Sequence, residues 1–210
     1  LVDDRTKRPR DPNTDLVTRI VTAEIDGEKI PYETQLNLCF TINLAGLDTT
    51  KSGLSYILYY LANNPDVRAR LVANPDLWPK AIEELIRYDS PHHYLPRVVG
   101  EDFDLHGTTL RKGQTLIEVM GAANHDESRF PDPTRLDVTR ANKHEHLSFA
   151  FGPHHCLGSA LARLEGEAVF GTLVRRFPNA QLLDDQPSYG GSAMLRAIQC
   201  LPTDLGAPVA

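Results

Sequence analysis

The chain has 210 residues, of which 41% are hydrophobic and 24% are charged, as in an ordinary globular protein. Its net charge of -6 argues against a nucleic-acid partner, because such binding requires a broad positive field. No stretch approaches the ~20 consecutive apolar residues that span a bilayer, so we expect no membrane association. The cysteines, Cys39, Cys156 and Cys200, are too widely spaced for a disulfide framework, which favours a reducing compartment and hence the cytoplasm.

The N-terminal third of the sequence predicts helices. Residues 3–13 are charged, contain two prolines and predict a surface loop, whereas residues 15–25 have the apolar spacing of a short amphipathic helix. Residues 33–63 contain no proline, and apolar residues from Leu36 and Phe40 to Leu61 recur every three, four or seven positions, with a second such stripe beside them, which predicts one long helix buried on more than one side. Such a helix would be on the order of 45 Å long, enough to cross a whole domain.

The remaining sequence predicts a mixture of helices and short strands. Residues 65–73 and 79–89 predict two further helices, and residues 97–120 contain short β-like runs broken by glycines. Residues 124–148 are polar, carry prolines and lack periodicity, and they are too many for an ordinary connector. A last helix is expected at 157–176. The expected fold class is therefore mainly α with small β-sheets (α+β).

Cys156 ends a loop with the sequence FAFGPHHCLG, residues 149–158, directly before the last predicted helix. A helix N-terminus offers unpaired N–H groups and a positive dipole end, which favour a thiolate, and a thiolate is a metal ligand. On this residue alone a buried structural cysteine is the simpler interpretation. A zinc site is a second alternative, although the spacing of the nearby histidines is not a standard zinc pattern. These histidines are His144, His146, His154 and His155.

The long predicted helix contains the sequence AGLDTT at residues 45–50. Glycine in a helix interior costs ~1 kcal/mol relative to alanine, so its presence indicates that something approaches the backbone closely. Asp48 and Thr49 place an acid beside an alcohol, a pair that can relay protons from solvent to a bound ligand. A helix crossing eased by small residues explains the same composition, and these residues alone do not decide between the two.

Glu84 and Arg87 are three positions apart in a predicted helix and therefore share a face. The default interpretation is a surface ion pair, which contributes little to stability.

These three segments, in this order, resemble the cytochrome P450 family. Residues 149–158 resemble the family's haem-binding loop, F-G-x-G-x-H/R-x-C-x-G, with Ala150 at the usual first glycine. Residues 45–50 resemble the motif A/G-G-x-D/E-T, and Glu84 with Arg87 resembles the E-x-x-R pair. The resemblance covers essentially all of residues 1–210. It implies the C-terminal, haem-binding half of a soluble bacterial-type P450 domain, with the N-terminal half absent.

The resemblance implies haem b (iron protoporphyrin IX) as the cofactor and O2 as the co-substrate. It makes Cys156 the iron ligand and assigns His154 and Arg97 to the haem propionates. Further implied haem contacts are Phe149, Gly152, Gly158 and Ala45. The implied catalytic residues are Gly46 in the oxygen groove and Asp48 and Thr49 in the proton relay.

In the family an arginine from the segment before the cysteine loop joins the buried E-x-x-R pair. The match of residues 130–136 to that segment makes Arg135 the expected third member of a triad with Glu84 and Arg87. The resemblance also suggests substrate-pocket residues, which are Thr41, Leu44, Tyr94, Leu95, Ala193 and Met194.

The implied function is a monooxygenase that inserts one oxygen atom of O2 into an apolar small molecule, in secondary metabolism, with electrons from an acidic ferredoxin. Candidate docking residues are Arg68, Arg70, Lys80 and Arg163, which plain solvated charges explain equally well. The alternative function is a non-catalytic P450-like module that stabilises a partner enzyme. Cys156 argues against the module, and the missing half argues for it. Without that half, we expect the chain to expose apolar surface and to hold haem poorly.

Overall fold

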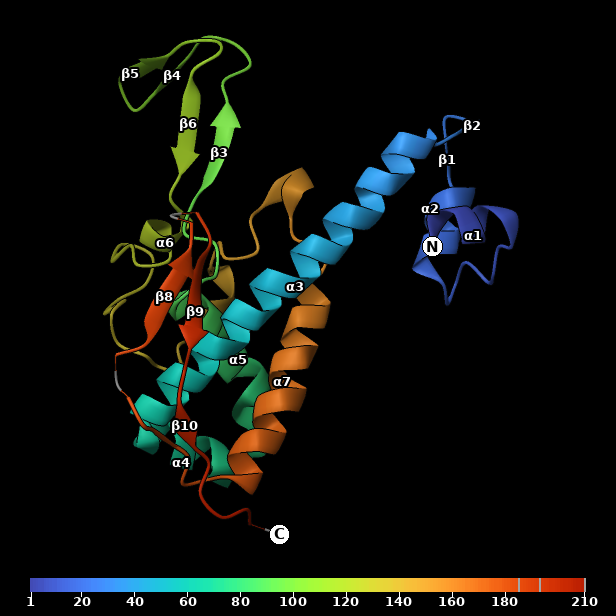
Figure 1. Ribbon diagram of the computed structural model, residues 1–210. Coiled ribbons are helices and arrows are strands. Elements are labelled where there is room, and N and C mark those ends of the chain that lie inside the picture. The colour runs from blue at the N-terminus through green and yellow to red at the C-terminus, as the bar shows by residue number, and fades with distance from the viewer. Residues whose placement is uncertain (185, 193, 210) are drawn as a thin grey trace. The chain divides into compact units, whose positions relative to one another are not determined.

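The computed structural model describes residues 1–184, 186–192 and 194–209, in two compact units whose boundary falls between Asp48 and Thr49. The first unit carries two short helices and a small hairpin, followed by the start of the longest helix (Figure 1). Its elements are α1 (Val2–Lys7), α2 (Leu16–Thr22), β1 (Glu24–Ile25), β2 (Glu28–Lys29) and the first part of α3 (Tyr32–Asn63).

Helix α1 lies in the segment that was expected to be a surface loop, so that prediction is wrong for Val2–Lys7. Its sequence suits a helix, because acidic residues fill the first turn and basic residues the last, as the helix dipole favours. Val2 is buried, and the Arg5 guanidinium donates to the Asp15 carboxylate at 2.8 Å. Asp15 in turn caps α2 by accepting from the Thr18 backbone N–H at 2.7 Å, so one carboxylate joins both helices.

The second unit contains the rest of α3 and the remaining helices, which lie close to their predicted ranges except for the short α6, which the sequence did not predict. The predicted ranges 33–63, 65–73 and 79–89 correspond to α3, α4 and α5 to within one residue, and the last helix begins two residues later than expected. The helices are α4 (Pro65–Ala73), α5 (Trp78–Tyr88), α6 (Met120–Ala123) and α7 (Ser159–Arg176). Single turns of 3-10 helix are η1 (Pro75–Leu77), η2 (Lys143–Glu145) and η3 (Gly152–His154).

The strands of the second unit form small antiparallel pairs. In the β3–β6 pair Arg97 lies opposite Leu116, and in the β8–β9 pair Tyr189 lies opposite Ile198. The pairs β4–β5 and β7–β10 are shorter. The strands are β3 (Leu95–Val98), β4 (Phe103–Leu105), β5 (Thr108–Leu110), β6 (Thr115–Glu118), β7 (Gln181–Leu182), β8 (Ser188–Gly191), β9 (Arg196–Cys200) and β10 (Thr203–Asp204).

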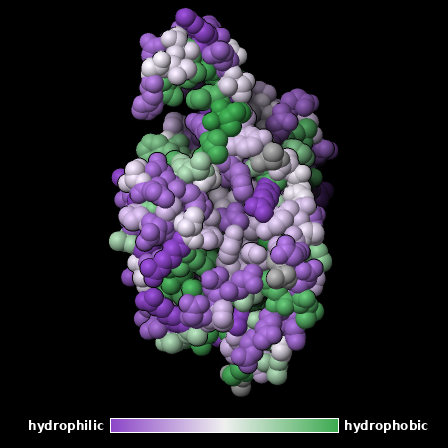
Figure 2. All heavy atoms as spheres, turned by 90° about the vertical axis from the view of Figure 1, so that its left-hand side faces the viewer, coloured by the Kyte–Doolittle hydropathy of each residue, from purple (hydrophilic) through white to green (hydrophobic). Residues whose placement is uncertain are grey.

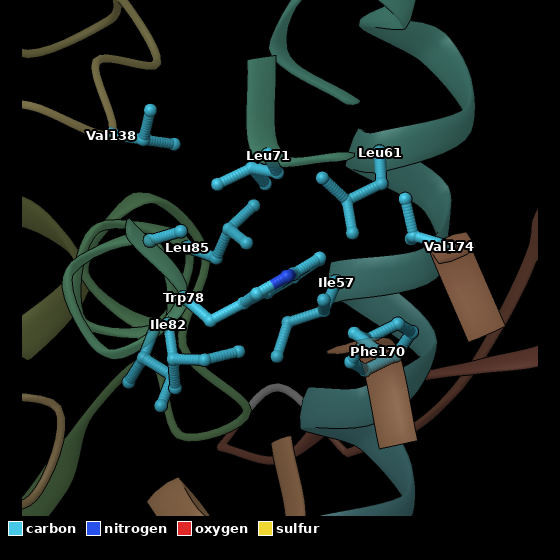
Figure 3. Packing of buried hydrophobic residues seen from close by; sticks show 11 residues of the cluster. Ile57, Leu61, Leu71, Trp78, Ile82, Leu85, Val138, Phe170 and Val174 are labelled. Atoms are coloured by element: carbon cyan, nitrogen blue, oxygen red, sulfur yellow. The ribbon is translucent and has the colours of Figure 1, made fainter. Parts of the chain in front are cut away.

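The hydrophobic core of the second unit lies among α3, α4, α5 and α7 (Figure 3). Trp78 at the start of α5 is only 5% exposed, and its ring points toward Ile57 of α3, beyond which Phe170 of α7 lies (Figure 3). Leu71, Ile82 and other aliphatic side chains complete the cluster. Since burying each of these side chains contributes about 1.5–3 kcal/mol, the cluster is a rigid base for the loops that α5 and α7 carry.

The segment between α6 and the cysteine loop has little regular structure but is well tied to the core. Asn124 is fully buried; its side-chain carbonyl accepts from Leu147 N–H at 2.7 Å, and its amide donates to Ser148 Oγ at 2.8 Å. Ser148 Oγ donates to the Ile86 carbonyl at 2.9 Å. One asparagine therefore joins the two ends of the long segment and fixes both against α5.

The expected fold class, mainly helical with small sheets, is confirmed. Among the described residues, no helix is long and apolar enough to cross a membrane. On the face shown in Figure 2, hydrophobic side chains occur in small patches among hydrophilic ones.

Candidate functional site

The cysteine loop is a compact turn structure between Phe149 and the first residue of α7. The Cys156 backbone N–H donates to the Phe149 carbonyl at 2.8 Å, which closes the loop, and His155 N–H donates to the Gly152 carbonyl at 3.0 Å within it. The Ser159 N–H donates to the Cys156 carbonyl at 3.2 Å, where the loop leads into α7. The cysteine is thus held three residues before the first helical residue.

The loop contains two residues in the left-handed region of backbone conformation. Gly152 has φ +68°, which glycine adopts freely, and Ala150 has φ +57°, which an L-residue with a Cβ adopts at a cost of about 1–2 kcal/mol. Ala150 stands where the family pattern has glycine, and its backbone conformation shows why glycine is usual there. The alanine leaves the loop conformation in place and adds strain to it.

The surroundings of Cys156 suit a large apolar ligand with a metal at its centre. Cys156 itself is exposed, and its neighbours Phe151 and Leu157 are 84% and 89% exposed. Gly158 keeps space beside the sulfur, because a Cβ at this position would lie 4.0 Å from Cys156 Sγ. Exposed aromatic and aliphatic side chains around one available thiol match the needs of haem, which combines a wide apolar ring with an iron that takes an axial thiolate.

The zinc alternative has no support in the arrangement of the histidines. His144 and His154 are exposed, whereas His146 is buried and bonded through its ring to Glu83. Across residues 1–184, 186–192 and 194–209 there is no group of three or more His, Cys, Asp or Glu side chains placed to hold a metal ion.

Arg97, the expected propionate ligand, lies on β3 and pairs with Glu118 on β6 at 3.2 Å. Both side chains are more than a third exposed, so this pair is worth at most about 1 kcal/mol. Exchange of Glu118 for a better-placed carboxylate would therefore cost little. His154, the other expected propionate partner, is exposed at the end of η3.

The structure brings together part of the expected substrate pocket. The Met194 carbonyl accepts from His93 N–H at 3.0 Å, which places Met194 beside the segment that contains Tyr94 and Leu95. Ala193 lies outside the described residues.

In the first unit, Thr41 and Leu44 are exposed on α3. An apolar hollow of about 490 Å³ occurs in this unit, but it is lined by other residues of the helix, including Phe40 and Ile42, together with Val17 and Ile20 of α2. Thr41 and Leu44 do not line this hollow.

The oxygen-motif residues all lie within α3, which continues through them without a break. Ala45, Gly46 and Asp48 are exposed, and Thr49 is half-buried. A Cβ added to Gly46 would meet nothing within 4 Å, so the helix presents open backbone there. This is the surface that a ligand lying against the helix requires.

Glu84 and Arg87 form a completely buried ion pair rather than a surface pair. Arg87 Nε and Nη2 donate to the two Glu84 carboxylate oxygens at 2.7 and 3.0 Å, and neither side chain is exposed. Arg87 also donates to the backbone carbonyls of Asn124 and Pro133, at 2.6 and 3.0 Å. All three nitrogens of the Arg87 guanidinium therefore donate to an oxygen, as burial of a charge requires.

The third member of this network is Arg140, so the prediction of Arg135 is wrong. Arg140 Nε lies 3.1 Å from Glu84 Oε1, and the residue is only 8% exposed. Arg135 is exposed, and only its backbone carbonyl takes part, accepting from Arg140 Nη2 at 3.0 Å. The turn through residues 131–135, in which Asp132 has φ +50°, presents its carbonyl groups to Arg140, and so the Arg135 side chain points to solvent.

Sequence reasoning missed Arg140 and the buried Asn124. The five-residue spacing between Arg135 and Arg140 gives no periodic signal in a segment without regular structure. A single asparagine in a polar stretch carries no signal of burial at all.

Two of the expected docking residues are not free surface charges. Arg68 is buried, with its guanidinium donating to the Ala180 carbonyl at 2.6 Å. Arg163 is paired with Glu83. Arg70 and Lys80 are exposed.

The structure thus has an exposed thiol directly before a helix and a buried Glu–Arg–Arg network in the segment that precedes the cysteine loop, two of the features by which the sequence resembles the cytochrome P450 family. Comparison with known proteins agrees. The family model described as Cytochrome P450 matches residues 2–197. The chain therefore belongs to the cytochrome P450 family.

Similar proteins include several bacterial members of the family. The chain is 37% identical over 196 residues to the "Biotin biosynthesis cytochrome P450" of Bacillus subtilis, covering 93% of this chain and 49% of the relative. It is 36% identical over 184 residues to the "Mycinamicin IV hydroxylase/epoxidase" of Micromonospora griseorubida, covering 87% and 45%. The solved structure of the bacillaene polyketide synthase cytochrome P450 PksS from Bacillus subtilis superposes with a TM-score of 0.90 at 34% identity, covering 97% and 52%. The chain thus spans about half the length of these relatives.

Proposed function

We propose that the protein to which this chain belongs is a haem-thiolate monooxygenase that inserts one oxygen atom of O2 into an apolar small molecule. The observation that carries the proposal is the exposed Cys156 thiol on a closed loop directly before α7, in a chain of the cytochrome P450 family. When bound, haem b supplies the iron that binds O2 and the oxidising power for oxygen insertion.

The chain's own residues hold the cofactor in this proposal. Cys156 would provide the sulfur that binds the haem iron, and Gly158 leaves space next to it. Arg97 and His154 would neutralise the haem propionates, and Arg97 would give up its half-exposed carboxylate partner, Glu118, to bind one of them. Phe149, whose carbonyl closes the loop, holds Cys156 from the opposite end.

Asp48 and Thr49 move protons to the bound ligand. In this proposal the exposed Asp48 would take protons from the solvent side, and the half-buried Thr49 hydroxyl would pass them on or donate a hydrogen bond, as the resemblance to the family motif implies. Gly46 leaves the backbone of α3 open on the N-terminal side of these two residues.

The names of relatives and the exposed charges support a substrate class and an electron donor for this proposal. The names of the relatives refer to biotin biosynthesis, mycinamicin hydroxylation or epoxidation, and a polyketide synthase, which supports an apolar small molecule and a role in secondary metabolism. An acidic ferredoxin would dock by its charge on basic residues that remain exposed, such as Arg70 and Lys80. The free thiols of Cys39, Cys156 and Cys200 support a cytoplasmic location.

The test is the absorption spectrum of the reduced, carbon monoxide-treated protein encoded by the complete gene. We expect the red-shifted Soret band of thiolate ligation in the wild type and its loss in Cys156→Ser. A wild-type protein without bound haem would contradict the proposal and favour the non-catalytic module. A screen for substrate-induced spin shifts in the haem spectrum then identifies the substrate.

A further inference from the structure

Glu83 is bonded to both flanks of the cysteine loop. It lies on α5 beside Glu84, and its side chain is 14% exposed. On the N-terminal side of the loop, His146 Nε2 lies 3.2 Å from Glu83 Oε2. On the C-terminal side, Arg163 of α7 forms a two-pronged ion pair with the same carboxylate, through Nε to Oε1 and through Nη2 to Oε2 at 3.2 Å. Residues 147–158, which contain Cys156, lie in the sequence between these two contacts.

The hydrogen bonds of His146 define its tautomer. Ser148 N–H donates to His146 Nδ1 at 3.1 Å, so Nδ1 carries the lone pair and Nε2 carries the proton that it donates to Glu83. The ring is buried, with a side-chain exposure of 1%. His146 therefore donates to Glu83 from one flank of the loop, and Arg163 supplies a charged partner from the other.

Charge and burial show that the Glu83 contacts are strong. Burial works against charge on the Glu83 carboxyl group, yet the hydrogen bonds from His146 and Arg163 lower its pKa to about 2. The contacts with His146 and Arg163 thus stabilise the ionised Glu83 carboxylate by more than burial destabilises it.

The same residues surround the Phe149 ring. The Arg163 guanidinium carbon lies 4.5 Å from the ring centroid, and the His146 ring lies 5.7 Å away on a tilted plane. A third ring, that of His155, is T-shaped to it at 6.4 Å. Because the Phe149 carbonyl accepts the Cys156 N–H, a fixed Phe149 also fixes the backbone of the cysteine.

We propose that Glu83 is a positioning residue for the haem ligand: with His146 and Arg163 it ties the two flanks of the cysteine loop to α5 and so fixes where Cys156 presents its sulfur. This inference rests on the proposed haem-thiolate function. It adds to that function a carboxylate distinct from Glu84, which contacts Arg87 and Arg140 instead. Adjacent residues on one helix therefore have separate tasks, since Glu84 orders the segment before the loop and Glu83 orders the loop itself.

The test compares Glu83→Ala, Glu83→Gln and Arg163→Lys with a core control, Val174→Ala. Val174 is 3% exposed near the far end of α7, so its truncation lowers stability without touching the loop. Two quantities are measured: hydrogen exchange of the residue 149–158 amides in the haem-free chain, and the fraction of thiolate-ligated carbon monoxide complex in the haem-loaded product of the complete gene.

For Glu83→Ala we expect faster exchange at the Cys156 amide and about tenfold weaker haem affinity, the scale on which outer partners of metal ligands act. The thiolate-ligated fraction should fall as well. Glu83→Gln keeps an acceptor without the charge, and Arg163→Lys keeps the charge without the planar fork, so both should show intermediate losses. Arg163→Ala should have a smaller effect in the Glu83→Ala background than alone, because the ion pair is already lost there and only the contacts of Arg163 with Phe149 and the Ser159 carbonyl remain to be removed.

An unchanged loop exchange and thiolate fraction in Glu83→Ala would overturn the inference, and so would equal changes in Val174→Ala. If Glu83→Ala does not fold, the milder Arg163→Lys gives the same comparison. A wild-type protein without a thiolate band would refute the proposed function instead, and loop exchange in the haem-free chain would still report on Glu83.

Discussion

Arg140→Ala is expected to destabilise the protein far more than Arg135→Ala, although the two arginines are five residues apart in one turn-rich segment. Arg140 donates to both Glu84 oxygens at 3.1 and 3.2 Å. It also donates to three backbone carbonyls, those of Pro131, Asp132 and Arg135, at 2.6, 3.0 and 3.0 Å. Its removal leaves the fully buried Glu84 with one guanidinium partner and leaves the carbonyls unpaired.

Breaking a buried ion pair by removing one partner costs about 3–5 kcal/mol. Hydrogen bonds to charged groups contribute about 1.5–3 kcal/mol each but are not additive within one network, so we expect Arg140→Ala to cost about 3–5 kcal/mol in all. This is a large share of the ~5–15 kcal/mol that stabilises a typical domain. The exposed Arg135 should change the free energy of unfolding by less than about 0.5 kcal/mol.

Urea denaturation followed by circular dichroism measures the difference. With a dependence on urea of about 1–3 kcal/mol per molar, the midpoint for Arg140→Ala should fall by roughly 2 M, and that for Arg135→Ala should not move measurably. Equal destabilisation by the two substitutions would refute the assignment of Arg140 as the main arginine partner of Glu84 in this segment.

Three further predictions concern the loop and its supports. Ala150→Gly should stabilise the protein by about 1 kcal/mol because it removes a Cβ at φ +57°, and Gly152→Ala, at φ +68°, should destabilise it by a similar amount; urea denaturation of both variants checks the signs. The pKa of Glu83 is lowered in the folded state from 4.5 to about 2, so its contribution to stability is complete above pH 4.5 and is lost as the pH falls toward 2. A Glu83→Gln variant should lose less stability than the wild type over this pH range. Identical acid denaturation curves for the two proteins would contradict the prediction. Gly166→Leu should cost about 1–3 kcal/mol, because even a Cβ at this position of α7 would lie 3.0 Å from Ile82 Cδ1 of α5; a thermal melt that does not fall below that of wild type would show that the two helices separate easily.

Local sequence patterns were sufficient for the helices but not for the buried polar network. The proline-free run of α3 and the apolar spacing of α5 reflect the periodicity of a helix, and this information lies within each segment. Arg140 contacts Glu84 across 56 positions, and His146 contacts Glu83 across 63. Such pairs depend on how a segment without regular structure folds back, which no periodicity encodes. Helix α1 was missed because two nearby prolines outweighed the favourable charges of a six-residue segment.

The residues of the candidate site likewise fall into those that local sequence could locate and those that depend on contacts between distant segments. The cysteine loop is continuous in sequence, so its glycines, its cysteine and the following helix could be located together. Met194 approaches His93 through the pairing of distant segments, and the ion pair of Arg97 with Glu118 depends on the register of β3 with β6. These contacts required the three-dimensional structure.

The way in which Arg140 holds its turn has an evolutionary consequence. The groups it binds in residues 131–135 are main-chain oxygens, which every amino acid possesses, rather than particular side chains. The surface of that turn is therefore open to wide variation among descendants of this sequence, while a single guanidinium beneath it must be retained. A saturation library across the turn should accordingly yield many folded variants at Thr134 and Arg135 and almost none at Arg140.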